Sequence, residues 1–296
     1  MKIVQSYWSK PTHKTKGINT YDRNAGGWIE RKYNLMSWAL SCLQFREFYD
    51  NVQLVTDEAG KSLLIDELAL PYTDVQLELD SLNDYNEDLW ILGKLHTYAI
   101  QKEPFIHADG DIFIWDKLGV EIESSPLISQ HLEHNYPYYK DIIEEIEDNF
   151  DYIPQSIIDQ RASSKSINAC NAGILGGHSL DFFKKYTDEA FKFINNNKDN
   201  VDKEKIGYYN IIFEQYLFYC MAHEQDVEIC YLAGDVGPRF EALVQFNGVP
   251  NRTRYVHPLG FYKKMPSICD QIANRLRKDH PDYYYRITHL LQENRI

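Results

Sequence analysis

Short apolar runs alternate with segments of helical periodicity through the first 116 residues of the chain. Apolar runs of strand length separated by helices are typical of βαβ units, in which parallel strands are buried on both faces of a central sheet. We therefore expect an α/β protein with a mostly parallel, Rossmann-like central sheet flanked by helices. The expected strands lie in KIVQSYW (2–8), DNVQLVTDEAG (50–60), DVQLELDSL (74–82) and PFIHA (104–108), and the expected helices cover residues 30–49, 61–70 and 86–103.

The second half of the chain alternates less regularly. The expected strands are SPLISQHLEHN (125–135), VEICYLAG (227–234) and ALVQFNG (242–248), INACNAGILGG (167–177) is a strand or a turn, and residues 178–197 and 205–225 are helices. The polar stretch NNNKDNVDKE (195–204) lies between two of these helices, so it is a helix connection and not a domain linker. We expect one domain, 1–296, with a nucleotide-binding half (1–116) and an elaborated C-terminal half (117–296) that ends in a helical tail.

The balance of charge restricts the kind of partner. The formal net charge is −13, whereas a nucleic-acid-binding surface needs a concentration of lysine and arginine, so nucleic acid is disfavoured as a partner. The C-terminal segment differs from the rest of the chain because basic residues gather there. The tail RLRKDHPDYYYRITHLL (275–291) is therefore a candidate for peripheral contact with an anionic membrane surface.

The cysteines and the N-terminus indicate a cellular location. The five cysteines are an odd number without a C-x-x-C pair, which favours reduced thiols over a disulfide framework or a zinc site. The start MKIVQSYWSK turns polar too early for a signal peptide, and no apolar run approaches the length of a membrane-spanning helix. We expect a cytoplasmic protein, at most peripherally bound at the inner face of the membrane.

Two aspartates follow the apolar strand PFIHA, in the segment HADGDIFIW (107–115). Ligands of α/β sheets bind at the carboxyl ends of the strands, which is where Asp109 and Asp111 fall. Carboxylate oxygens suit Mg²⁺ or Mn²⁺, and Gly110 between them would let a ligand approach the backbone. The alternative is a β-turn whose two acids face water.

Two later segments favour a binding site. NAGILGG (171–177) combines small and apolar residues, a composition that lets a backbone approach a ligand closely. YVHPLGFYKK (255–264) contains His-x-x-Gly-x-x-Lys, in which His257 can complete a metal site and Lys263 can reach a diphosphate as a point charge. Taken singly, neither would count as evidence, because a single histidine is more often a structural residue and a lone lysine usually lies on the solvated surface.

These three segments, in this order after an alternating α/β half, resemble those of metal-dependent nucleotide-sugar glycosyltransferases of the GT-A fold. HPLGFYKK resembles the element found in the retaining group that includes glycogenin and the bacterial lipopolysaccharide galactosyltransferases. The Pro-Trp that usually follows the lysine is absent, because Lys264 and Met265 follow Lys263 here. The subfamily and the retaining or inverting outcome therefore stay open.

The resemblance implies a role for each matching residue. Asp109, Asp111 and His257 would hold Mn²⁺ or Mg²⁺ on the donor diphosphate, and Lys263, with the backbone at Gly260, would stabilise the departing nucleoside diphosphate. The residues implied on the sugar side are Asn171, Glu214 and Gln215. The implied partners are a nucleotide-sugar donor, with a UDP-sugar expected, and a glycan or lipid-linked saccharide as acceptor.

Several further candidates depend on strand-end geometry rather than on a motif. We expect Tyr7 or Trp8 to stack on the base, Asp57 to meet base or ribose, and Lys94 to approach phosphate. Two acids in GDVGPRFEAL, Asp235 and Glu241, are candidates for acceptor contacts.

Two other functions remain open from the residues. A phosphohydrolase of the haloacid dehalogenase type also ends an apolar strand in Asp-x-Asp, although that motif normally lies near the N-terminus and is followed by Thr or Val, where this chain has Ile112. A catalytically silent carbohydrate- or nucleotide-binding protein would keep the same fold without turnover.

Overall fold

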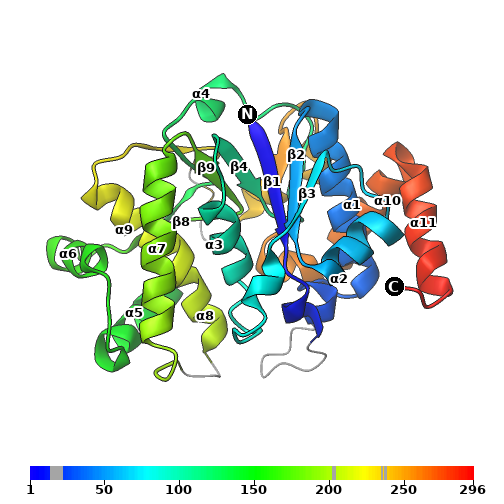
Figure 1. The fold of residues 1–296 in the computed structure, drawn as a ribbon. Coiled ribbons are helices and arrows are strands. Elements are labelled where there is room, and N and C mark those ends of the chain that lie inside the picture. Colours follow the sequence, from blue (N-terminus) through cyan, green and yellow to red (C-terminus); the bar gives the residue numbers. More distant parts are fainter. Residues whose placement is uncertain (14–22, 202–204, 235, 237–238) are drawn as a thin grey trace. The chain divides into compact units, whose positions relative to one another are not determined.

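A computed structural model describes residues 1–13, 23–201, 205–234, 236 and 239–296 and shows an α/β protein (Figure 1). The chain divides into two compact units. The first unit comprises residues 1–87, 108–118 and 239–296, and the second comprises residues 88–107 and 119–238. In both, strands are flanked by helices. Among the described pairs of the larger sheet, three are parallel and one is antiparallel, which confirms the predicted α/β class with a mostly parallel sheet.

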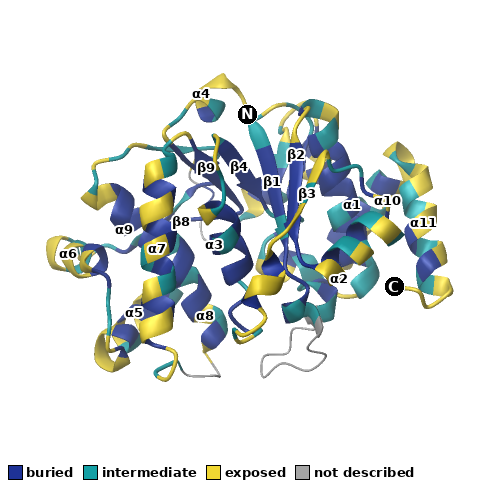
Figure 2. Ribbon diagram, in the orientation of Figure 1, coloured by how far each residue is buried: buried dark blue, intermediate teal, exposed yellow. Residues whose placement is uncertain are grey.

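The first unit contains three parallel strands, in the order β1-β2-β3. Ile3 of β1 lies opposite Val52 of β2, and Gln53 of β2 lies opposite Asp74 of β3. Every residue of β2 is buried (Figure 2), as expected for a strand covered on both faces. The bounds are β1 (Lys2–Tyr7), β2 (Val52–Thr56) and β3 (Asp74–Leu77), with α1 (Arg31–Phe48) between β1 and β2 and α2 (Glu58–Lys61), continued by a π-helix (Ser62–Glu67), between β2 and β3.

The C-terminal tail is part of the core of the first unit. Helices α10 (Pro266–Asp279) and α11 (Pro281–Gln292) pack on α1, and Ile287 and Leu290 of α11 are buried in the same apolar cluster as α1. Some of the basic side chains of this tail have partners within the unit. Arg277 lies over the ring of Tyr284, and Arg286 donates a hydrogen bond to the carbonyl oxygen of Glu67. The apolar face of α11 therefore covers protein.

Two short antiparallel strands complete the first unit. These are β5 (Phe113–Ile114), which follows the Asp-Gly-Asp turn, and β11 (Tyr255–Val256), which precedes His257. Their pairing brings the C-terminal segment to the turn, as described below.

The second unit contains the strand order β10-β6-β9-β4. β10 is parallel to β6, and β9 is antiparallel to β6. The strand bounds are β4 (Phe105–Ala108), β6 (Leu127–Ser129), β9 (Ile174–Gly177) and β10 (Ile229–Tyr231), and β7 (Leu132–His134) pairs separately with β8 (Asn168–Cys170). The helix bounds are α3 (Leu92–Ala99), α4 (Val120–Glu123), α5 (Pro137–Asn149), α6 (Gln155–Ser163), α7 (Leu180–Asn196), α8 (Ile206–Ile211), a π-helix (Ile212–Tyr216) and α9 (Leu217–Glu224).

One expected strand is wrong. Residues 242–248 lie mostly in two 3₁₀ helices, Glu241–Val244 and Phe246–Gly248. Phe240 has a left-handed backbone (φ 57°), and Leu243 and Phe246 are both buried. Leu243 lies in the first of these helices and Phe246 in the second, so each short helix buries one apolar side chain and the apolar pattern needs no strand.

Residues 125–135, expected as one strand, form two strands, β6 and β7, separated at Gln130 and His131. The backbone N–H of Gln130 donates to the carbonyl oxygen of Asn171 at 3.1 Å, and the N–H of Asn171 donates to the carbonyl oxygen of His131 at 3.0 Å. The chain therefore changes partner from β9 to β8 at this point. The segment 167–177, expected as a strand or turn, is two strands joined by a turn at Asn171.

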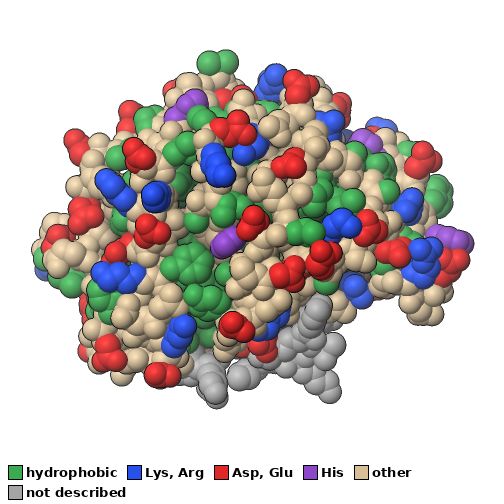
Figure 3. Space-filling view, in the orientation of Figure 1, with side chains coloured by type: hydrophobic (Ala, Val, Ile, Leu, Met, Phe, Trp, Pro, Cys, Tyr) green, Lys and Arg blue, Asp and Glu red, His purple; other side chains and the backbone are tan. Residues whose placement is uncertain are grey.

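The face in Figure 3 carries acidic and basic side chains interspersed. Within the described ranges, no helix combines the length and the apolar content that crossing a bilayer requires.

Candidate functional site

The Asp-Gly-Asp segment is a turn that begins where β4 ends at Ala108, as predicted. The backbone N–H of Ile112 donates to the carbonyl oxygen of Asp109 at 3.2 Å and closes the turn. Two side chains hold it from neighbouring elements. Gln5 of β1 donates to the same carbonyl oxygen at 3.3 Å, and Ser37 of α1 donates to the carbonyl oxygen of Gly110 at 2.9 Å. The backbone that carries both aspartates is thus anchored to the strand and helix beneath it.

The glycines of the Asp-Gly-Asp turn and of the segment 171–177 have a packing role. A Cβ on Gly110 would lie 2.4 Å from the Trp38 indole. Within the second unit, a Cβ on Gly176 would lie 2.2 Å from the carbonyl oxygen of Phe105, and one on Gly177 would lie 2.1 Å from that of Pro126. These three glycines therefore permit close packing of protein on protein, and their approach to a ligand stays a prediction.

The pairing of β11 with β5 brings His257 to Asp111. Val256 lies opposite Phe113 in the antiparallel register, so the next residue, His257, falls beside the start of β5. The imidazole Nε2 of His257 lies 3.3 Å from Oδ1 of Asp111. The 3₁₀ helix Gly260–Lys264 follows, and its Lys263 ammonium forms an ion pair with Oδ2 of Asp111. Gly260 begins this helix with a left-handed backbone, φ 51°, that favours glycine.

The environment of Asp111 favours its charged form. Asp111 is only 7% exposed and His257 2%. Burial by itself raises the pKa of Asp111, but Lys263 and His257 together outweigh burial and hold the pKa well below its ordinary value. A carboxylate with this electrostatic setting is ready to meet a cation or a cationic group at neutral pH.

The geometry fits a divalent metal. Asp109, Asp111 and His257 each offer a ligand atom, and these atoms lie within 4.8 Å of one another. Among the described residues, Oδ1 of Asp111 is buried and accepts no hydrogen bond of good geometry, although Nε2 of His257 lies 3.3 Å from it, so this oxygen can serve as a metal ligand. Two carboxylates and an imidazole are a donor set suited to Mn²⁺ or a similar ion. The group is therefore compatible with metal binding.

Two residues of this cluster were not predicted. Tyr255 lies two residues before His257, and burial together with the charges of Asp109 and Asp111 raises its pKa well above the ordinary value. Its alternation with His257 along a strand was the available signal, because residues i and i+2 share a face. Trp28 carried no such signal. The Lys263 ammonium lies 5.7 Å from the centre of its ring, and Lys264 donates to its carbonyl oxygen at 2.7 Å.

A second polar cluster lies within the second unit and contains four of the predicted residues. Lys94 of α3 donates to the carbonyl oxygen of Ala172 at 2.8 Å, and its Nζ lies 3.1 Å from Oε1 of Glu214. Glu214, in the π-helix, also accepts a hydrogen bond from Tyr98 at 2.6 Å. Lys94 and Glu214 are both buried. This buried charge pair is satisfied on both sides, as a charge in the interior requires.

The other two predicted residues of this cluster meet around a carboxylate that was not predicted. The Asn171 side-chain N–H donates to Glu133 at 2.7 Å, and the Tyr139 hydroxyl lies within hydrogen-bonding distance of both Glu133 and Gln215. Glu133 stands in the segment SPLISQHLEHN, where a glutamate within an apolar run was the only signal.

The strand-end candidates of the first unit have structural partners. Tyr7 belongs to the apolar core and meets Trp38 edge to face, with the ring centres 5.1 Å apart. Asp57 caps α2, since Oδ1 accepts from the N–H of Gly60 at 2.7 Å and Oδ2 accepts from the N–H and hydroxyl of Ser9 at 2.7 and 2.8 Å. Glu241 is exposed, and Asp235 lies outside the described residues. Roles for Tyr7 and Asp57 toward a nucleotide stay predictions.

The cap at Asp57 predicts a loss of stability. Asp57→Ala is expected to lower the free energy of unfolding by about 2 kcal/mol, because N-cap residues contribute on the order of 1–2 kcal/mol and the Ser9 donors also lose their acceptor. Urea unfolding of wild type, Asp57→Ala and Asp57→Asn measures this, and the asparagine variant should lose less because its side-chain oxygen still caps the helix. Equal stability of all three proteins would contradict the structural role.

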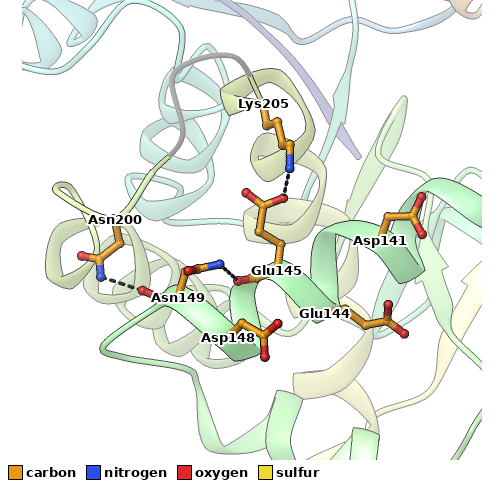
Figure 4. A pocket seen from close by; sticks show the side chains of 7 residues that line it. All are labelled: Asp141, Glu144, Glu145, Asp148, Asn149, Asn200 and Lys205. Atoms are coloured by element: carbon orange, nitrogen blue, oxygen red, sulfur yellow. Dashed lines mark hydrogen bonds and ion pairs between the residues drawn. The ribbon is translucent and has the colours of Figure 1, made fainter.

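An acidic hollow lies over α5, and none of the predicted site residues lines it. Its lining includes Asp141, Glu144 and Asp148, and Lys205 forms an ion pair with Glu145 at its edge (Figure 4). The excess of carboxylates would repel a phosphate.

The fold and site define an α/β protein with an Asp-Asp-His group next to a lysine. Asp111 and His257 of this group are buried and Asp109 is half-buried, and the group is compatible with metal binding. The chain belongs to the family described as "Family of unknown function (DUF6734)", whose model matches residues 1–290. No curated protein matches the chain.

Two solved structures of LgtC are similar to the chain. One, of an active-site mutant, has 12% identity and a TM-score of 0.39 and covers 78% of this chain and 72% of its own. The other is described as the galactosyltransferase LgtC in complex with donor and acceptor sugar analogues. It has 12% identity and a TM-score of 0.41 and covers 87% of this chain and 86% of its own.

Proposed function

We propose that the protein is a metal-dependent GT-A-type glycosyltransferase that moves a hexose from a nucleotide diphosphate sugar, a UDP-sugar, to a hydroxyl group of a glycan or lipid-linked saccharide. One observation carries the proposal: His257 and Lys263, from a segment far along the chain, meet the same carboxylate of the Asp-Gly-Asp turn. A buried carboxylate, an imidazole and a lysine that converge in this way suit a cation and a diphosphate together.

The chemistry of the transfer assigns the roles. Breaking the bond between the sugar and the diphosphate leaves negative charge on the departing nucleoside diphosphate, and groups that neutralise this charge stabilise the transition state. Asp109, Asp111 and His257 would hold a divalent ion, Mn²⁺ or Mg²⁺, which supplies part of that positive charge when bound. The ammonium of Lys263 supplies more, and the backbone at Gly260 would contact the phosphate.

The resemblance also assigns residues to recognition of the sugar. In this proposal Asn171, Glu214 and Gln215 contact its hydroxyl groups, and Lys94, which holds Glu214 in place, contributes positive charge toward phosphate. Tyr7 and Asp57 would contact base and ribose. The proposed location is the cytoplasm, at the inner face of the membrane when the acceptor is lipid-linked, with the basic C-terminal tail as the contact.

Titration calorimetry of UDP with and without Mn²⁺ tests the proposal, with ADP as a control for the base. We expect UDP to bind only when Mn²⁺ is present, and UDP-hexoses to be hydrolysed slowly in the absence of acceptor. No binding of any nucleotide diphosphate in Mn²⁺ or Mg²⁺ would overturn the proposal. Tight binding of beryllium fluoride without UDP binding would favour a phosphohydrolase instead, and UDP binding without turnover across a panel of donors would favour a binding protein.

A further inference from the structure

The side chain of Glu133 is the centre of a buried hydrogen-bond cluster in the second unit. Glu133, on β7, is only 2% exposed. Its Oε1 accepts from the Asn171 side-chain N–H at 2.7 Å, and its Oε2 accepts from Tyr138 at 2.8 Å and from Tyr139 at 2.7 Å. A carboxylate at this depth is retained only when donors satisfy it, and three donors do so here.

The Glu133 carboxylate lies between two residues, Asn171 and Gln215, that different sequence segments predicted. Asn171 stands at the turn between β8 and β9, and Gln215 stands in the π-helix 212–216. Glu133 accepts a hydrogen bond from Asn171 directly. Its contact with Gln215 is indirect and passes through Tyr139, whose hydroxyl lies 3.1 Å from Oε1 of Gln215. Glu133 is therefore placed to orient both amides.

The orientation of Asn171 follows from its two contacts. The backbone N–H of Gly173 donates to the Asn171 side-chain oxygen at 3.1 Å, so the amide nitrogen faces Glu133. Because a carboxylate only accepts hydrogen bonds, this arrangement matches the donor of Asn171 to the acceptor of Glu133.

The orientation of Gln215 follows from counting protons. The Tyr139 hydroxyl has one proton and two neighbouring acceptors, Oε2 of Glu133 at 2.7 Å and Oε1 of Gln215 at 3.1 Å. A carboxylate is the stronger acceptor and the closer one, so it takes the proton. With the proton directed to Glu133, Oε1 of Gln215 would face the tyrosine oxygen with no proton between them. We infer that the amide is turned by 180°, so that its nitrogen donates to the tyrosine oxygen. In that orientation the carbonyl oxygen of Gln215 points away from Tyr139 and can accept a hydrogen bond from a ligand.

We propose that Glu133 is a positioning residue: it acts through Asn171 directly and through Tyr139 on Gln215, so that the two amides recognise the hydroxyl groups of the transferred hexose. This inference rests on the proposed function and names the residue that determines recognition of the sugar. Glu133 itself does not touch the sugar.

The two tyrosines provide a matched pair of variants. Both donate to the same oxygen of Glu133, but among the contacts of these two side chains described above only Tyr139 reaches Gln215. Tyr138→Phe therefore removes a donor to Glu133 and leaves the link to Gln215 intact, whereas Tyr139→Phe removes both. Glu133→Gln keeps the size of the side chain, but its amide can donate to Tyr139, which turns the tyrosine proton toward Gln215 and reverses the arrangement.

The experiment measures dissociation constants of UDP and of UDP-glucose and UDP-galactose, with Mn²⁺ present, by calorimetry on wild type and the three variants. Tyr139→Phe and Glu133→Gln should bind UDP within about 2-fold of wild type. For the UDP-hexose that wild type binds more tightly, the ratio of the dissociation constant of UDP to that of the UDP-hexose should fall about 10-fold in both variants. This is the effect of losing one hydrogen bond of about 1.4 kcal/mol. Tyr138→Phe should stay within about 2-fold for both ligands.

Several results would overturn the inference. Equal behaviour of the two tyrosine variants, or unchanged discrimination in Tyr139→Phe and Glu133→Gln, would show that Glu133 has only a structural role. If one of these two variants does not fold, as judged by its melting temperature, the other decides. Wild type that binds neither UDP nor UDP-hexose would reject the proposed function itself, which separates that failure from failure of the role of Glu133.

Discussion

Asp111→Asn is expected to abolish the Mn²⁺-dependent binding of UDP. Asp111 is the carboxylate on which both His257 and Lys263 converge, and its Oδ1 is a buried oxygen in the metal-compatible group. Removing one partner of a buried charge pair costs on the order of 2–5 kcal/mol, which corresponds to about 30-fold to several thousand-fold in affinity. Calorimetric titration of UDP in Mn²⁺, and of Mn²⁺ alone, measures the loss directly.

A neighbouring aspartate provides the control. Asp116 forms an ion pair with Arg254, and its side chain is 42% exposed. Asp116→Asn removes the same charge from the same part of the chain, yet it should change the affinity for UDP by less than about 2-fold, since exposed ion pairs contribute little. If Asp111→Asn binds UDP and Mn²⁺ as wild type does, the Asp-Gly-Asp segment is an ordinary turn and the proposed site is wrong.

Lys263→Met is expected to weaken the binding of the diphosphate without weakening the binding of the metal. The ammonium of Lys263 pairs with Asp111 and lies over the Trp28 ring, so it reaches the site without being a metal ligand. Removing a group that stabilises charge developing in a transition state typically lowers turnover by 10²–10³-fold. We expect hydrolysis of UDP-hexose and affinity for UDP to fall, while the affinity for Mn²⁺ alone is kept or increases, because the metal no longer shares the Asp111 carboxylate with an ammonium group.

The adjacent lysine is the matched control for this variant. Lys264 carries the same charge one residue later, but its Nζ donates to the carbonyl oxygen of Trp28. Lys264→Met should retain UDP binding within a few-fold, with any loss appearing as a lower melting temperature. Loss of Mn²⁺ binding in Lys263→Met would contradict this prediction, since it would show that the lysine is necessary for binding the metal.

Much of the fold was predictable because its signals are local. Runs such as VQLVT predict strands through their content of β-branched residues, and the alternation of strands with helices implies a mostly parallel sheet, which is confirmed. The error at residues 242–248 has the opposite cause. Leu243 and Phe246 have an apolar spacing that several structures satisfy, and packing in the tertiary structure selected two 3₁₀ helices there.

The candidate site was predictable where a motif carries its own chemistry. Asp109, Asp111, His257 and Lys263 each stand in a short segment whose residue types suit a cation or a phosphate, and the first three do form one metal-compatible group, with Lys263 paired to Asp111. Trp28 and Glu133 could not be ranked in this way. A buried tryptophan or a glutamate within a strand has no distinguishing pattern until its neighbours are known.

The sequence by itself determined the kinds of elements along the chain and the chemical groups available to a site, because hydrophobic periodicity and side-chain chemistry are properties of short segments. Only the tertiary structure decided which groups meet. The antiparallel pairing of β5 with β11 sets His257 beside Asp111, and the packing of Trp38 explains why residue 110 is a glycine. The linkage of Asn171 to Gln215 through Glu133 arises in the same way. The physical reason is that hydrogen bonds and ion pairs act over about 3–4 Å, whereas residues distant in sequence come that close only when burial of apolar surface folds the whole chain.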